Sequence, residues 1–188
     1  MTFRTNYRKM RKIAGGWAAA VGEALVINAA LNALASAPRE AEPKAVVEVG
    51  IKEMLEKIAD PGIATVGRNR VGLVRDDGAT FSLRRLEVQG LEALELPQLG
   101  YSIFNPPGLP PDVVAETKDV LKRELDRPIR NQGDLGRLAL WIGWIFHRVH
   151  EANHTVGPFV EMAFLVRTRA GVVDREFRGR SSELAAKL

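Results

Sequence analysis

The longest dense apolar run of the chain constrains its fold most, because such a run must be buried in a core or against another subunit. It extends from Leu138 to Phe146, within a segment, Asp134–His154, that also holds two of the three tryptophans and all three histidines. Apolar residues recur there at three- and four-residue steps, the period of a helical stripe: Leu138, Trp141, Ile142, Ile145 and Val149. We therefore expect a buried, tryptophan-rich helix over about 134–154, with Asp134 as its N-cap.

The second half of this helix carries a candidate metal site. His147, Glu151 and His154 fall at positions i, i+4 and i+7, and His150 lies one turn before His154. Two histidines one turn apart, with a carboxylate, can hold a zinc ion. The alternative is that these side chains end the helix, where the dipole favours a cationic imidazole. The chain has no cysteine, and it lacks the glutamate that follows the first histidine in zinc proteases.

A change of period predicts a β-hairpin over about 68–87. Apolar residues alternate with smaller or polar ones on either side of Asp76-Asp77-Gly78, and Asp-Gly between alternating runs is a strong hairpin signal. Asp76 and Asp77 are expected to serve the turn, although they could form a metal-binding or acid/base pair. The hairpin is basic and could lie in a DNA groove or simply face solvent. The residues that could contact DNA are Arg68, Asn69, Arg70, Arg75, Arg84 and Arg85.

The remaining segments divide into helices and two open cases. Helices are expected over 13–36, over about 44–59, from Pro111 through about Asp126, and in a short tail from Ser181. The strand or helix character of Leu91–Leu96 stays open. For residues 157–180 the pattern slightly favours two strands that turn at Ala170-Gly171 over one helix.

The N-terminus is a basic arm. Residues 1–12 hold five positive charges and no acid, whereas the middle of the chain is net negative by about four. The arm can bind an acidic partner, either the negative middle of a neighbouring subunit or nucleic-acid phosphates, or it is a solvated extension. We favour the neighbouring subunit, because two aromatic rings have no role in a purely electrostatic contact. The candidate partner-binding residues are Phe3, Arg4, Tyr7, Arg8, Lys9, Arg11 and Lys12.

The same end of the chain resembles a cleavable secretory peptide. A basic stretch, an apolar run from Ile13 and Ala35-Ser36-Ala37 follow in that order. Glu23, Asn28 and Asn32 interrupt the apolar run. We therefore expect a helix of the mature protein and no membrane span.

One stretch resembles a known family. Residues 147–164, HRVHEANHTVGPFVEMAF, are similar to the C-terminal part of small head–tail joining or tail-completion proteins of tailed phages. The matching residues are Val149-His150-Glu151 and Pro158-Phe159, and the stretch covers about a tenth of the chain. The glycine-rich proline turn usual in the first half of those proteins has no clear counterpart. The resemblance implies an α+β subunit of a ring around a DNA channel, without catalytic residues and located in the virion.

These observations predict an α+β, mainly helical protein with a single domain over 13–188 behind the arm of residues 1–12. The sequence has no Gly-rich phosphate loop, no nucleophile elbow and no thiol. We therefore expect no cofactor and no catalytic residue, and favour a structural or assembly subunit that forms a homo-oligomer, with other assembly proteins as further partners. The alternatives are a metal-binding protein or metal-dependent enzyme, and a basic nucleic-acid-associated protein. Outside the phage interpretation, the cytoplasm is the expected location.

Overall fold

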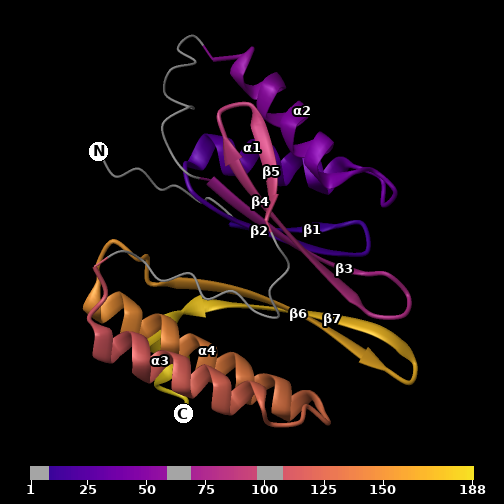
Figure 1. The fold of residues 1–188 in the computed structure, drawn as a ribbon. Helices are drawn as coiled ribbons and strands as arrows, with labels where there is room; N and C mark the ends of the chain where they lie inside the picture. Colours follow the sequence, from indigo (N-terminus) through magenta and orange to yellow (C-terminus); the bar gives the residue numbers. More distant parts are fainter. Residues whose placement is uncertain (1–8, 59–68, 97–107) are drawn as a thin grey trace. The chain divides into compact units, whose positions relative to one another are not determined.

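The computed structural model describes residues 9–58, 69–96 and 108–188, and these form an α+β protein. The strands build a five-stranded antiparallel sheet in the order β1-β2-β3-β4-β5 and a separate two-stranded sheet, β6-β7 (Figure 1). The chain groups into two compact units. Unit 1 takes in Met1–Gly100 and Leu165–Asp174, and unit 2 takes in Tyr101–Phe164 and Arg175–Leu188.

Unit 1 is a meander in which consecutive strands are neighbours, with two helices inserted between β2 and β3. Its elements are β1 (Met10–Ile13), β2 (Gly16–Val21), α1 (Ala24–Ser36), α2 (Pro43–Leu55), β3 (Asn69–Asp76), β4 (Phe81–Gln89) and β5 (Glu92–Leu96). The loops between β1 and β2 and between β4 and β5 are tight, and each contains a glycine with positive φ, Gly15 at 75° and Gly90 at 60°. Glycine adopts this left-handed conformation without the steric cost that other residues have there.

The core of unit 1 lies between one face of the sheet and the two helices. Fully buried side chains from α1, α2 and the central strands form one cluster that includes Leu31, Leu34, Val47, Ile51, Leu73 and Leu86. The two helices approach closely at Gly50, where an added Cβ would lie 2.5 Å from the Cβ of Ala33. The Glu42 carboxylate accepts the amide hydrogen of Ala45 and caps α2. The small residues at the crossing join α1 to α2, and the buried cluster holds this helical layer on the sheet.

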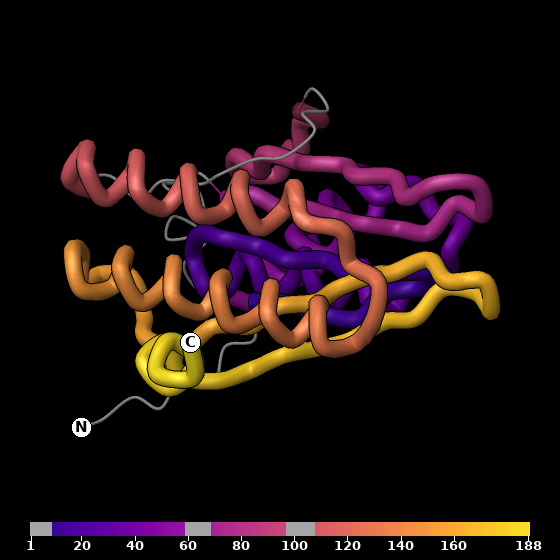
Figure 2. The backbone as a smooth tube through the Cα atoms, turned by 90° about the horizontal axis from the view of Figure 1, so that it is seen from below, coloured from indigo at the N-terminus to yellow at the C-terminus, as the bar shows by residue number. Residues whose placement is uncertain are grey.

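Unit 2 combines a pair of helices with the base of the β6–β7 hairpin. Its elements, the tip of the hairpin excepted, are α3 (Pro111–Leu125), α4 (Gln132–Ala152), β6 (Phe159–Thr168), β7 (Gly171–Arg180) and α5 (Ser181–Ala185). Helices α3 and α4 lie side by side in both views (Figures 1 and 2). The buried cluster between α4, the hairpin and α5 is small and consists of Ala139, Val160, Met162 and Leu184.

The prediction of a mainly helical protein is wrong, chiefly because of residues 13–23. The expected helix over 13–36 is instead the β1–β2 hairpin followed by α1. Gly15 forms the tight turn, and a Cβ added at Gly16 would lie 1.9 Å from the carbonyl oxygen of Val74, so close strand pairing requires glycine there. Ala18 and Ala20 are buried beneath the helices. Tertiary packing thus outweighs the helix propensity of alanine in this segment.

The tryptophan-rich helix exists as α4, but two of its expected features are wrong. Trp141 and Trp144 are half-buried, and the buried positions of α4 are Leu135, Leu138, Ala139 and Gly143. The N-cap is Asn131, whose side-chain oxygen accepts the amide hydrogen of Asp134. The Asp134 carboxylate instead accepts the backbone N–H of Arg130 at 2.9 Å.

Several other expected elements are confirmed. The hairpin over 68–87 is β3 and β4, although these are two of the five strands of a larger sheet. The segment from Pro111 forms α3, residues 157–180 include a β6–β7 hairpin with Ala170 in its loop, and the tail from Ser181 forms α5. The segment Leu91–Leu96, which the sequence left open, is mostly strand β5. None of the helices in the described ranges has the length and hydropathy that a bilayer span requires. The single domain over 13–188 stays a prediction.

Candidate interaction surfaces

The histidine face of α4 makes local contacts. His147 Nε2 lies 3.5 Å from Glu151 Oε1, and His150 Nδ1 lies 2.6 Å from the carbonyl oxygen of Val156. The rings of His150 and His154 pack edge to face with centroids 5.5 Å apart. Within the ranges that the structure describes, no three His, Asp or Glu side chains gather as a metal site requires. This geometry gives the metal hypothesis no support, and it ties the end of α4 to the turn that follows.

Several apolar side chains of unit 2 are exposed or half-buried. Phe159 is 65% exposed and Phe146 is 40% exposed, while Trp141 and Trp144 are half-buried and pack edge to face at 5.8 Å. The Arg180 guanidinium covers part of the Phe159 ring at 5.1 Å. Leu125, Ile129 and Leu188 of the same unit are also exposed. We call the seven apolar residues of this set, which lie on α3, α4 and β6 and in the segments that follow α3 and α5, the aromatic surface of unit 2.

A buried carboxylate joins α3 to α4. Glu124 is 1% exposed and forms ion pairs with three arginines, Arg123 at 3.2 Å, Arg127 at 3.3 Å and Arg137 at 3.4 Å. The Arg123 guanidinium also lies 4.9 Å from the centre of the Trp141 ring. A buried carboxylate is tolerated only when it is paired and hydrogen-bonded. Glu124 therefore holds the arginines, and through Arg123 the tryptophan, at the α3–α4 contact.

The basic arm is described in part. Phe3, Arg4, Tyr7 and Arg8 lie outside the described residues, whereas Lys9, Arg11 and Lys12 lie in or beside β1, an edge strand of the five-stranded sheet. Lys12 Nζ is 2.5 Å from a carboxylate oxygen of Asp174 within unit 1. Arg11 is opposite the buried Ala18 in the ladder, so its side chain lies on the helix-covered side of the sheet.

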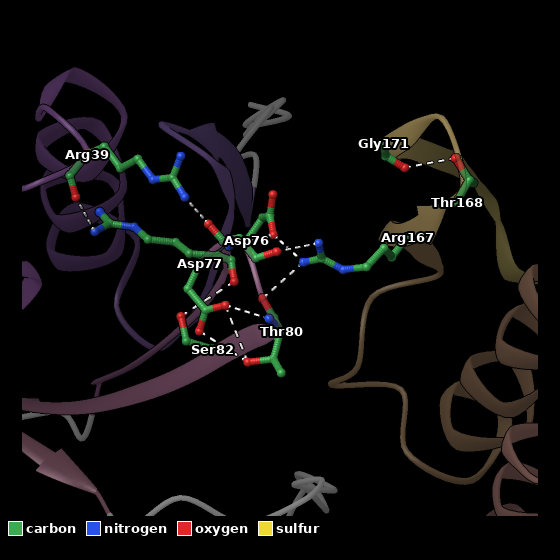
Figure 3. A network of polar contacts seen from close by, with 10 residues as sticks. Arg39, Asp76, Asp77, Thr80, Ser82, Arg167, Thr168 and Gly171 are labelled. Carbon is green, nitrogen blue, oxygen red and sulfur yellow. Dashed lines mark hydrogen bonds and ion pairs between the residues drawn. The ribbon is translucent and has the colours of Figure 1, made fainter.

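The two aspartates of the β3–β4 hairpin stabilise its turn (Figure 3). Asp77 Oδ1 accepts the amide hydrogen of Thr80 at 2.7 Å, and this hydrogen bond lowers the pKa of the Asp77 carboxyl. Asp76 Oδ1 accepts the amide hydrogen of Gly78 at 3.1 Å and also binds the Arg167 guanidinium. Arg167 further donates to the carbonyl oxygen of Gly78 at 2.6 Å. The turn interpretation of this pair is therefore favoured over a metal-binding or acid/base one.

Arg70 and Arg75 of the β3–β4 hairpin have an acidic and a carbonyl partner. Arg70 pairs with Glu87 at 3.1 Å, and Arg75 donates to the carbonyl oxygen of Arg39 at 3.0 Å. Asn69 is buried, and its side-chain oxygen accepts the amide hydrogen of Glu23 at 2.7 Å. Arg68 lies outside the described residues. The ion pair of Arg70 with Glu87 and the hydrogen bond of Arg75 to Arg39 favour a structural role over DNA readout by this hairpin.

The opposite edge of the sheet is acidic. Strand β5 is its other edge strand and contains Glu92 and Glu95 but no basic residue. Glu95 and Glu42 share one guanidinium, that of Arg84, at 2.7 and 2.5 Å. Hydrogen bonds from Arg84 lower the pKa of the Glu95 carboxyl, which is therefore ionised at neutral pH. Glu48 Oε1 accepts the amide hydrogen of Ala93 at 3.0 Å.

Comparisons with known proteins identify no relative. No family model, no curated protein and no solved structure matches this chain.

Two of these features were missed by the sequence reasoning. The acidic edge has a weak sequence signal, since Gly90 is a turn residue and Glu92 and Glu95 follow it in a segment left open. Burial of Glu124 has no local signal, because the acid lies among charged neighbours on an amphipathic helix. Only the three-dimensional approach of Arg137 from α4 distinguishes it from an ordinary surface glutamate.

Proposed function

We propose that the chain is a non-enzymatic structural subunit that self-associates into a homo-oligomer. The observation that carries the proposal is the aromatic surface of unit 2, where Phe159 is 65% and Phe146 40% exposed. Exposed aromatic residues are typical of protein–protein interfaces, whose buried centres are enriched in Trp, Tyr and Phe. A second copy of the chain would remove these rings from water.

The rigidity of this surface adds to the argument. Arg180 stacks on Phe159, and Arg123, which Glu124 holds, stacks on Trp141. Side chains already ordered in the free protein lose less conformational entropy on association. Arginine next to an aromatic ring is also a combination common at the energetic centre of interfaces. The aromatic surface is therefore suited to a stable contact rather than to a transient one.

The narrower proposal is a head–tail joining or tail-completion subunit of a tailed phage. Its support is the resemblance of residues 147–164, which includes the end of α4, the turn held by His150 and the exposed Phe159. The α+β architecture is also the class that the resemblance implies. Mass spectrometry of purified virions from the lysate that contains this chain tests the proposal. Detection of the chain in the virions, with portal and tail genes beside its own gene, supports it, and absence from intact virions contradicts it.

A matched pair of variants tests the general proposal. Phe159→Ser should weaken self-association by about tenfold or more, because an aromatic anchor of an interface typically contributes 2 kcal/mol or more. Val49→Ser is the control, since Val49 is also exposed, at 56%, but lies on α2 of unit 1. Sedimentation velocity over a concentration series measures both. Equal association of wild type and Phe159→Ser would exclude this surface as the interface.

A further inference from the structure

We infer that strand β1 of one copy adds to strand β5 of the next copy as a parallel neighbour, so that copies join head to tail through one continuous sheet. The inference rests on the proposed self-association and adds a second contact to that of the aromatic surface, made by the sheet edges of unit 1. Strands β1 and β5 end the five-stranded sheet among the described residues. An edge strand presents unpaired N–H and C=O groups, which are a template for another strand.

The topology fixes the direction of this pairing. All four neighbouring pairs of the sheet are antiparallel, so β1 and β5 run in the same direction. A second copy that keeps its strand direction and its helical layer on the same side therefore places β1 parallel to β5. Such a contact uses two different surfaces, and repeated contacts of this kind close into a ring or extend into a filament.

The hydrogen bonds of the edge strands limit the register to those in which edge-facing groups meet. Lys9 accepts from the N–H of Ala20 on β2, so by alternation the backbone groups of Met10 and Lys12 point toward the open edge. Ala93 N–H is bound by Glu48, so the backbone groups of Ala93 and Glu95 point away from β4.

One of these registers places Glu95 opposite Arg11 of the next copy in a parallel ladder and so pairs opposite charges. Its N–H donates to the carbonyl oxygen of Met10, and its carbonyl oxygen accepts from the N–H of Lys12. The N–H of Met10 donates to the carbonyl oxygen of Ala93.

The side chains agree with this register on the helix-covered side of the sheet. Arg11 is opposite the buried Ala18 and Glu95 is opposite the buried Leu86, so Arg11 and Glu95 lie on the same side. Glu95 and Glu42 now share the single guanidinium of Arg84. Arg11 of the next copy supplies a second cation to these two carboxylates and completes the neutralisation of the cluster.

The other face of the sheet agrees as well. In the same register Met10 lies beside Leu94, which is 55% exposed in the single copy. Both residues point away from the helical layer, because Met10 is opposite the exposed Ala19 and Leu94 is opposite Glu87. The contact therefore covers an exposed leucine in addition to joining opposite charges.

Charge also opposes the two symmetric alternatives. Pairing β5 with β5 would bring Glu92 and Glu95 of two copies together, and pairing β1 with β1 would do the same for Arg11 and Lys12. Like charges on neighbouring strands are destabilising. The Glu48 carboxylate accepts the N–H of Ala93, so this N–H of β5 is not available to an unrelated strand.

A cross-linking experiment tests the register directly, because the chain contains no cysteine. Arg11→Cys and Glu95→Cys are made in separate chains, mixed and mildly oxidised. Neighbouring strands lie about 4.8 Å apart, within the range of Cα separations, about 4.4–6.8 Å, that a disulfide spans. We expect a cross-linked dimer in the mixture and none from either variant alone. Leu94→Cys mixed with Arg11→Cys is the matched control and should not cross-link, because Leu94 points to the other face.

Cross-linking of Leu94→Cys with Arg11→Cys as efficient as that of Glu95→Cys, or efficient cross-linking of a variant with itself, would overturn the inference. Charge reversal is the second measurement. Arg11→Glu should weaken association by about tenfold or more, and adding Glu95→Arg in the same chain should restore it. If the wild-type chain is monomeric at every concentration, the proposed function fails together with the inference. If it associates without the 11–95 cross-link, the inference alone fails.

Discussion

The two compact units bury their apolar side chains to very different extents. Among the described residues, fifteen buried apolar residues form one cluster between the sheet and α1–α2 in unit 1. In unit 2 eight are buried, four in the cluster of α4, the hairpin and α5 and four more on α3 and α4. The described aromatic rings of unit 2 are half-buried or exposed. Since burial of apolar area is the main favourable term in folding, unit 1 is stabilised within one copy. Unit 2 gains more from a contact with another chain.

The largest effect is expected from a cavity in unit 1. Leu31 is 0% exposed, so Leu31→Ala should lower the free energy of unfolding by about 4 kcal/mol, within the range of buried Leu→Ala changes. Leu140 is half-buried beside the small cluster of unit 2, so Leu140→Ala should lower the free energy of unfolding by only about 1–2 kcal/mol. Urea unfolding measures both. Equal losses would show that the two cores do not differ as described.

Unit 2 should in turn be sensitive to its buried charge. Glu124→Gln removes the carboxylate that pairs with three arginines and should lower the free energy of unfolding by about 3 kcal/mol. The control is Glu116→Gln, because Glu116 forms an exposed ion pair with Arg148 at 3.1 Å and should contribute at most about 1 kcal/mol. If both variants unfold at the same urea concentration, Glu124 does not hold α3 to α4.

Substitution of two glycines of α4 by alanine should change the stability by smaller amounts and in opposite directions. A Cβ at Gly143 would lie 2.4 Å from the Cβ of Leu184, so Gly143→Ala should displace α5 and cost about 1–3 kcal/mol. Gly136 has no neighbour within 4 Å of an added Cβ, so Gly136→Ala should stabilise the helix by about 0.5–1 kcal/mol. Amide hydrogen exchange in residues 181–188 is a second measurement, and it should show weaker protection in Gly143→Ala. Unchanged protection there in Gly143→Ala would contradict close packing of α5 on α4.

The smallest effect is a dependence on pH at the acidic edge of unit 1. Hydrogen bonds from Arg84 hold the pKa of Glu95 below its ordinary value of 4.5. A depressed folded-state pKa stabilises the protein above the unfolded-state value, and this contribution is lost as the pH falls through the folded-state value. Urea midpoints at pH 7 and pH 3 should therefore differ slightly less in Arg84→Gln than in wild type. An identical pH dependence would show that this pair does not contribute.

Sequence patterns predicted the elements whose signals are local. The Asp77-Gly78 turn located β3 and β4, and the proline and acid at Pro111-Asp112 located the start of α3. Residues 13–23 failed because an alanine run is compatible with a helix or with a strand that lies beneath helices. The Gly15-Gly16 pair was the signal for a turn, and it was outweighed by alanine propensity.

The candidate interaction surfaces depend on contacts that no spacing reveals. The stripe on α4 identified the helix, but which of its apolar residues remain exposed depends on what α3, β6 and α5 cover. The acidic edge likewise exists because β5 ends the sheet, a property of strand order. Opposite charges on the two edge strands could be interpreted only once that order was known.

Light scattering of the wild-type chain during size-exclusion chromatography, over a wide range of concentrations, tests the central claim most directly. One copy has a mass of 20.7 kDa. Self-association predicts a discrete species at a multiple of that mass, and its fraction should rise with concentration. A single species of 20.7 kDa at the highest concentration would contradict the account.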